Sequence, residues 1–239
     1  MTMTTGDSFR FEAGCAMFGT AGMQTFSEAG AGVWADKALA DDFLQCAVQS
    51  GIGTLRIGTA HAGEEVHLRK HLEEFVPDST SIQFVHMKEK GCEALTANGF
   101  TGIAFNVSPE QERAMAGVCA HSGIPFVSAV VSGAGLLLRY SPAGQAHSVH
   151  RPACDVLLKT LATSQPPDWV ETIVGMAAGF HTWHFVQSSL CSPRALSQVV
   201  LLDLWAMRRC DDATVIDQVL TGVCHPERIP WQVLWTQMR

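Results

Sequence analysis

The chain has 239 residues, of which 47% are hydrophobic and only 16% charged, which supplies a large core and argues against disorder. Its net charge is −7 and no Lys/Arg run offers a footprint for a phosphate backbone, so a nucleic-acid partner is not expected. The polar N-terminus lacks the apolar core of a signal peptide, and no apolar run approaches the ~18–20 residues that span a bilayer. We therefore expect a cytoplasmic protein without a membrane partner.

The predicted elements alternate between strands and helices. Strands are predicted at residues 15–22, 54–58, 81–87, 101–107, 124–131 and 170–174. Helices are predicted at 41–50, 64–75, 92–98, 108–121 and 151–163. The small residues after the first strand are predicted to form a loop, as is the region 133–144 with its three consecutive leucines. Further helices are expected in a C-terminal extension at about 181–239.

This alternation is typical of a single α/β domain in which helices cover a parallel sheet. Right-handed crossovers then give either an open sheet or a closed barrel. Six strands do not distinguish the two, because an eight-stranded barrel requires two more.

Several segments, in order along the chain, resemble the aldo-keto reductase family. Residues 18–23 match the family's first strand (G-x-G-T), and residues 51–60 match its second strand (G-x-x-x-x-D-T-A). Residues 85–88 match the end of the third strand, which carries a lysine, and residues 103–111 match the I-G-V-S segment. Residues 124–138 and 170–176 match two late strands. The resemblance implies a TIM-type (β/α) barrel. Because the stretch between Lys88 and Phe100 is too short for a full strand–helix unit, the barrel would be contracted, with fewer than eight complete units.

The resemblance fails at the family's catalytic tetrad of Asp, Tyr, Lys and His. Gly58 stands at the Asp position and Gly63 at the Tyr position, and the only tyrosine of the chain is Tyr140. The strand that carries the histidine has no counterpart, so only Lys88 matches. Since hydride transfer to a carbonyl needs a proton donor, the sequence predicts that the redox reaction has been lost.

The ends of the predicted strands supply the candidate catalytic residues, because active sites of such barrels lie at the carboxyl ends of the strands. Lys88 is the candidate base or Schiff-base nucleophile, supported by His61, His86 and Glu64. The same rule selects polar residues for substrate binding at Thr20, Arg56, Thr59, Asn106, Ser128 and Arg139.

Two glycines follow the last predicted strand. Gly175 and Gly179 are expected in a strand-to-helix turn whose free backbone N–H groups hold an anion, on the substrate or on NADPH. The histidine pairs at positions 67 and 71 and at 181 and 184 have helical spacing, but neither has a clear third ligand. We therefore predict no metal site, and we read the eight cysteines, none in a C-x-x-C pair, as buried reduced thiols.

Three functions remain open from the sequence. The first is a biosynthetic enzyme of specialised metabolism, of the lyase or cyclase type, that eliminates, cyclises or isomerises a small polar or anionic metabolite without a cofactor. The second is an NADPH-dependent carbonyl or imine reductase with a histidine as replacement acid. The third is a non-catalytic subunit of a homo- or hetero-oligomer, joined through the apolar C-terminal helices that include residues 229–235.

Overall fold

The computed structural model describes residue 16 and residues 19–35, 37–76, 80–133, 135–145, 171–191, 198–204 and 208–209, and the structural statements below concern these residues. Eight strands form one sheet in the order β3-β2-β1-β4-β5-β6-β7-β8. The strands are β1 (Gly30–Ala35), β2 (Thr54–Thr59), β3 (Ser81–His86), β4 (Thr101–Phe105), β5 (Phe126–Ser132), β6 (Gly135–Ser141), β7 (Gln198–Asp203) and β8 (Arg208–Arg209). The helices are α2 (Lys37–Gln49), α3 (Ala62–Leu72), α4 (Met87–Thr96), α5 (Pro109–Ser122) and α7 (Glu171–Cys191), with a 3-10 turn at Ala97–Gly99.

The sheet is open, which corrects the predicted barrel. Strands β1 to β5 are parallel, whereas β6, β7 and β8 each run antiparallel to the strand before them. Among the described residues, β3 pairs only with β2 and β8 only with β7, so the sheet does not close on itself. The predicted alternation of strands and helices is confirmed, but it is common to open sheets and barrels, and the described strands do not form the closing pair that a barrel needs.

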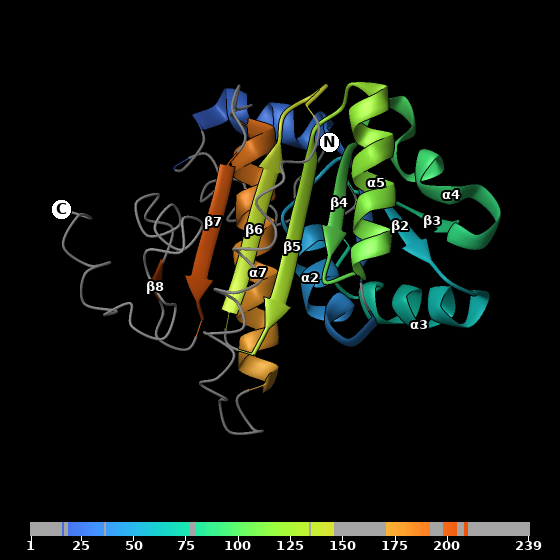
Figure 1. Cartoon of the computed structure of the whole chain (residues 1–239). Coiled ribbons are helices and arrows are strands. Elements are labelled where there is room, and N and C mark those ends of the chain that lie inside the picture. Colours follow the sequence, from blue (N-terminus) through green and yellow to red (C-terminus); the bar gives the residue numbers. More distant parts are fainter. Residues whose placement is uncertain are drawn as a thin grey trace.

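Two helical layers cover the sheet (Figure 1). Helices α2 and α7 pack on one face with the helical residues 19–28, and α4 and α5 pack on the other. Each layer has its own apolar cluster, the larger one lying beneath α2 and α7. None of the described helices combines the length and the hydropathy needed to cross a bilayer.

The central strand β1 was missed because it is rich in glycine and alanine. Its small residues let a helix and an aromatic ring approach the sheet closely. A Cβ atom at Gly32 would lie 2.3 Å from the carbonyl oxygen of Leu95 in α4, and one at Gly30 would lie 2.2 Å from the ring of Phe100. The segment predicted as a loop of small residues is therefore the strand at which the strand order reverses.

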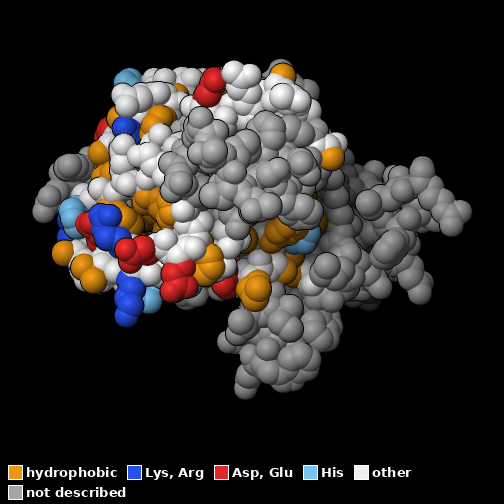
Figure 2. All heavy atoms as spheres, turned by 180° about the vertical axis from the view of Figure 1, so that it is seen from behind, with side chains coloured by type: hydrophobic (Ala, Val, Ile, Leu, Met, Phe, Trp, Pro, Cys, Tyr) orange, Lys and Arg blue, Asp and Glu red, His pale blue; other side chains and the backbone are white. Residues whose placement is uncertain are grey.

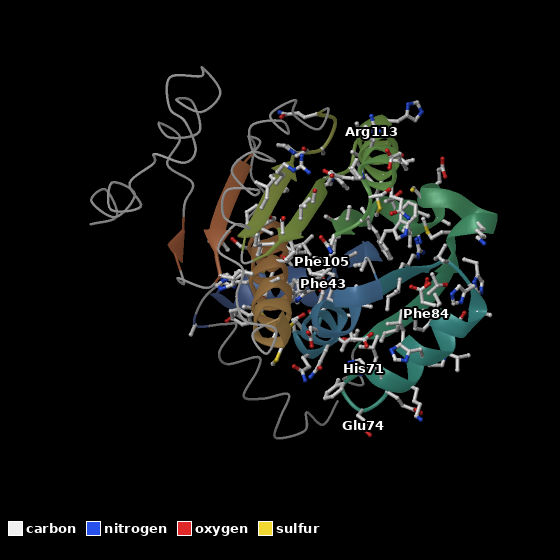
Figure 3. The ribbon with its side chains drawn as sticks, turned by 60° about the horizontal axis from the view of Figure 1, so that its bottom comes forward. Phe43, His71, Glu74, Phe84, Phe105 and Arg113 are labelled. Carbon is white, nitrogen blue, oxygen red and sulfur yellow. The ribbon has the colours of Figure 1, made fainter. Side chains whose placement is uncertain are left out.

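Helix α7 joins distant parts of the chain. Trp183 packs edge-on against Phe26 and Phe43, with ring centroids 6.1 and 5.7 Å apart. Phe43 in turn stacks on Phe105 at the end of β4, at 4.5 Å, and Figure 3 shows these two rings side by side in the core. At Gly179 a Cβ atom would lie 3.0 Å from the backbone nitrogen of Phe43, so this glycine sets the close contact of α7 with α2.

A buried ion pair fixes α5 to the antiparallel part of the sheet. The guanidinium of Arg139 in β6 donates to the Glu112 carboxylate of α5, and both side chains are at most 3% exposed. The Ser128 hydroxyl of β5 donates to the same carboxylate at 2.8 Å and accepts from Arg139 at 3.0 Å. Three elements are thus joined by charged and polar groups inside the core.

Four further predictions of secondary structure are wrong. Residues 19–28, placed mostly in a predicted strand and loop, are helical. The leucine-rich segment predicted as a loop is the buried strand β6, and the predicted strand at 170–174 overlaps the start of α7. In place of an all-helical C-terminal extension, the described residues after α7 form β7 and β8. The helix predicted at 151–163 and the apolar segment 229–235 lie outside the described residues.

Two histidines of α7 predict a loss of stability in mild acid. Burial lowers the pKa of His181, with repulsion from His184 adding to the effect, and burial lowers the pKa of His184. Below the ordinary value of 6.5 the unfolded chain takes up protons that the folded chain resists, so stability present above pH 6.5 is lost as the pH falls. We expect urea midpoints to fall between pH 7.5 and 5.5, and to fall less in a His181→Gln/His184→Gln variant; equal pH dependence in both proteins would contradict this.

Candidate functional site

A cleft of about 180 Å³ opens at the carboxyl ends of the parallel strands. In open α/β sheets ligands bind where the strand order reverses, which here is between β1 and its neighbour β4. The cleft is lined from β1, the end of β2 and the first turns of α3 and α5, by Trp34, Ala35, Gly58, Ala60, His61, Glu64 and Gln111. Its position in the sheet makes it the candidate site.

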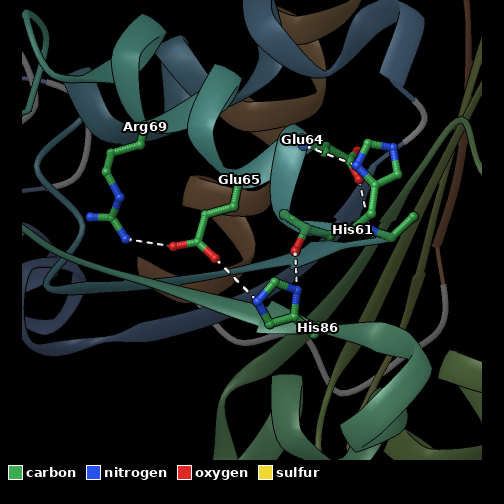
Figure 4. A network of polar contacts seen from close by, with 7 residues as sticks. His61, Glu64, Glu65, Arg69 and His86 are labelled. Atoms are coloured by element: carbon green, nitrogen blue, oxygen red, sulfur yellow. Dashed lines mark hydrogen bonds and ion pairs between the residues drawn. The ribbon is translucent and has the colours of Figure 1, made fainter.

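The first turn of α3 contributes two ionisable side chains to the cleft. His61 is the N-cap, and its Nδ1 accepts from the backbone N–H of Glu64 at 3.1 Å. Glu64 Oε2 accepts in return from the backbone N–H of Ala60 at 2.6 Å, as Figure 4 shows. Because Nδ1 acts as an acceptor, a neutral His61 carries its proton on Nε2 and offers a donor there. The second oxygen of Glu64, Oε1, has no partner among the described residues.

The first turn of α5 contributes an amide. Ser108 caps this helix, and its side chain accepts from the Gln111 backbone N–H at 3.3 Å. Gln111 Oε1 accepts from the Ser108 backbone N–H at 2.9 Å, which completes a capping box. This orientation leaves the Nε2 amide group of Gln111 with two donors for a ligand. Two capped helices therefore present polar groups to one cleft.

A second polar network lies beside the cleft, between α3 and the end of β3. His86 Nε2 lies 3.3 Å from Glu65 Oε2, and Glu65 Oε1 accepts from Arg69 at 2.8 Å. His86 Nδ1 lies 3.5 Å from the hydroxyl of Thr59, the last residue of β2. Thr59 is fully buried, so its hydroxyl is inaccessible to a substrate. The network joins α3 to the ends of β2 and β3 (Figure 4) and contributes no side chain to the lining of the cleft.

Charged side chains gather at this end of the molecule. Helix α3 has two acidic residues in its first turn and three basic ones in its last, which complements the helix dipole. Figure 2 shows this mixture of acidic, basic and histidine side chains at the lower left. The mixed signs neutralise one another and produce no basic patch.

The structure separates the four predicted catalytic residues. His61 and Glu64 line the cleft together. His86 belongs to the neighbouring network. Lys88 is exposed in the first turn of α4 and does not line the cleft, so the base proposed from the sequence lies outside the cleft that His61 and Glu64 share.

The predicted substrate-binding residues are also dispersed. Thr20 is exposed on a helix. Arg56 lies under the end of α4, where it donates to the carbonyl of Ala97 at 2.6 Å and its guanidinium lies 4.3 Å from the ring centre of Phe100. Asn106, with a positive φ of 53°, follows β4 and accepts from the Val131 backbone N–H at 3.1 Å. Each of the last two side chains is committed to structural contacts.

The remaining predictions fall on core elements. Ser128 and Arg139 belong to the buried pair with Glu112, and Thr59 to the His86 network. Gly175 and Gly179 lie inside α7, where helical hydrogen bonds occupy the backbone N–H groups that an anion would need. Sequence reasoning missed Trp34 and Gln111. The Ser-x-x-Gln capping signal placed Gln111 in the first turn of a helix. Trp34 was not considered, because the segment that forms β1 was predicted as a loop.

The connections after β1 and β2 differ from those that bind a dinucleotide in sheets of this kind. A single residue, Asp36, separates the end of β1 from the start of α2, and no G-x-G-x-x-G pattern occurs at this connection. The residue at the end of β2, where a carboxylate would bind a ribose, is the buried Thr59. In the described part of the chain, no group of three or more His, Cys, Asp or Glu side chains is arranged to hold a metal ion.

No family model and no curated protein matches the sequence. Solved structures do match the fold. E. coli MccB aligns over 84% of this chain and 68% of its own, with a TM-score of 0.60 and 10% identity. E. coli MccB with SeMet MccA aligns over 85% and 70%, with a TM-score of 0.59 and 10% identity. PaaA aligns over 87% and 73%, with a TM-score of 0.56 and 12% identity.

These neighbours overturn the resemblance to aldo-keto reductases, and with it the TIM-barrel lyase. The matched motifs were short, and two of the segments that carried them, at 18–23 and 170–176, fall largely on helices. A glycine followed by small residues is typical of tight packing in many α/β folds, so it did not identify one family. The chain has instead an open, Rossmann-like sheet, a fold that it shares with MccB and PaaA.

Proposed function

We propose that the chain is a partner-binding protein that takes one residue-sized group of a partner into the cleft and performs no nucleotide chemistry. The size of the cleft carries this proposal. Its volume of about 180 Å³ is below the ~300–1,000 Å³ of pockets that enclose drug-sized ligands. A side chain or a chain terminus fits such a volume, whereas a nucleoside triphosphate does not.

The chemistry at the carboxyl ends of the strands supports the same proposal. Glycines after β1 normally let the backbone approach a pyrophosphate, and here the connection is a single aspartate. The cleft carries the negative charge of Glu64, which repels phosphate groups. These features also disfavour the NADPH-dependent alternative.

The structural neighbours include a precedent for nucleotide binding and one for the binding of a partner. MccB has been solved with ATP, in a structure that aligns over 84% of this chain and 70% of its own, with a TM-score of 0.53 and 11% identity. MccB has also been solved with MccA. We propose that this chain retains the second kind of binding on the fold without the first.

Two titrations test the proposal. Calorimetry with magnesium–ATP and fluorescence with NADPH are expected to show no binding at millimolar ligand. Peptides selected on the wild-type chain from a random display library are expected to bind at least tenfold more weakly to Ala60→Phe, because the new ring fills the mouth of the cleft while the backbone N–H of residue 60 still donates to Glu64. Micromolar ATP binding, or equal peptide binding by both proteins, would refute the proposal.

A second function is favoured by one observation, the presence of His61 and Glu64 in the same cleft. Such a pair supports general acid–base catalysis on a small polar metabolite, as in the first function proposed from the sequence. The variant His61→Asn distinguishes the enzyme from the partner-binding protein, because an asparagine oxygen retains the helix cap but cannot transfer protons. Loss of turnover with unchanged peptide binding would favour the enzyme.

A further inference from the structure

We infer that the cleft selects a primary ammonium group, carried by a lysine side chain or by the N-terminal residue of the partner. This inference rests on the proposed function and specifies its ligand. Of the side chains that line the cleft, Glu64 is the one carboxylate, and no lysine or arginine is among them. The cleft therefore complements a cation, and the net charge of −7 attracts one from a distance.

The hydrogen bonds of Glu64 distinguish between cations. Oε2 is held by the backbone N–H of Ala60 at 2.6 Å, and Oε1 has no partner among the described residues. One available oxygen accepts from one donor of a compact ammonium group. A guanidinium binds best through two parallel bonds to both carboxylate oxygens, and the bond from Ala60 disfavours this arrangement because it already occupies one acceptor site of Oε2. The geometry thus favours lysine or an N-terminus over arginine.

The other lining residues match the rest of such a ligand. Trp34 contributes an indole, the aromatic ring that attracts cations most strongly. His61 offers an Nε2 donor when neutral, and Gln111 offers its amide donors. These donors suit the carbonyl oxygen of the residue that carries the ammonium group. The cleft therefore offers an acceptor for the charge and donors for the adjacent peptide group.

The experiment compares small probes on the full chain labelled with ¹⁵N, followed by amide chemical shifts. The probes are Nα-acetyl-lysine amide and glycinamide for the two sources of ammonium, with Nα-acetyl-norleucine amide and Nα-acetyl-arginine amide for comparison. We expect at least one ammonium probe to shift the amides of residues 60–64 and 111, with an affinity at least tenfold above that of the norleucine and arginine probes. The stronger of the two ammonium probes identifies the source.

Glu64→Gln is the informative variant, because the amide oxygen still accepts from Ala60 while the charge is removed. It is expected to reduce the preference for lysine over norleucine to less than twofold. Glu74→Gln is the matched control, since Glu74 is exposed beyond the C-terminal end of α3 (Figure 3), whereas Glu64 lies in the first turn of that helix. Circular dichroism verifies that both variants are folded.

The outcomes separate this inference from the proposed function. The inference is overturned if the norleucine probe binds as well as both ammonium probes, or if Glu64→Gln keeps the full preference for lysine over norleucine. In that case the proposed function is still supported if the selected peptides bind the wild-type chain and fail to bind Ala60→Phe. If ATP binds at the cleft, the proposed function falls. A preference for ammonium that is lost in Glu64→Gln and kept in Glu74→Gln supports the inference.

Discussion

Replacement of Glu112 by alanine is expected to lower the free energy of unfolding by about 3–5 kcal/mol. The variant removes the carboxylate that faces the guanidinium of Arg139, and both side chains are at most 3% exposed. The charge of Arg139 would then stay buried without its counter-ion, and the Ser128 hydroxyl would lose the oxygen to which it donates. Urea unfolding followed by circular dichroism measures the change.

Two control variants make this prediction specific. Glu110→Ala removes a carboxylate from the same helix, but one that is 75% exposed, so it should change stability by less than about 0.5 kcal/mol. The double variant Glu112→Leu/Arg139→Met replaces the ion pair by apolar groups and should recover most of the loss. A loss below about 1 kcal/mol for Glu112→Ala would show that water or backbone groups compensate the arginine.

Replacement of Gly32 by valine is expected to cost about 3 kcal/mol, the upper end of the range for overpacked cores. Even a single added carbon atom would lie 2.3 Å from the carbonyl oxygen of Leu95 and 2.7 Å from its carbonyl carbon. The obstacle is backbone, which cannot rotate away as a side chain does, so α4 must move from the sheet. Thermal unfolding of the variant measures the cost.

Gly117 provides the matched control. It lies exposed in α5, and a Cβ atom there would meet nothing within 4 Å. Gly117→Ala should therefore raise stability by about 0.5–1 kcal/mol, because alanine favours the helix. If both variants lost stability equally, the close approach of α4 to β1 would not be the cause.

The sequence predicts elements well where one local signal dominates. Helix α5 begins at its Ser-Pro capping sequence and ends before Gly123, which has a left-handed φ of 65° as its C-cap. Strand β2 and helix α3 follow from their apolar spacing and from the charges of the first turn of α3. These signals lie within a few residues of the element, so they need no knowledge of the fold.

The missed elements owe their structure to distant contacts. The glycines of β1 leave space for α4 and Phe100, which pack directly on the strand. These partners lie far along the chain, so no residue within the segment indicates a strand. Strand β6 is fully buried between two other strands, so its apolar run shows no alternation. Barrel and open sheet share the same local pattern, and only the strand order separates them.

The sequence predicted some of the residues that line the candidate site and misplaced others. His61 and Glu64 were found because they follow a strand and begin a helix, a local signal. Lys88 was expected beside them, but β3 is an edge strand, two strands from β1, and Lys88 lies beyond its end in the first turn of α4, outside the cleft. The order of strands decides which loops meet, and this order depends on pairings across the whole chain.

The contacts of α7 have a consequence for synthesis on the ribosome. The Cys191 thiol donates to the carbonyl of Gly22, and Gln187 to the sulfur of Met23, across more than 160 residues. The helical residues 19–28 and the apolar face of α2 must therefore wait for the last third of the chain, roughly 10–30 s at bacterial or eukaryotic rates of elongation. During that time Phe26 and Phe43 are not yet covered by Trp183, so we expect the nascent protein to depend on chaperones more than a fold with local contacts would.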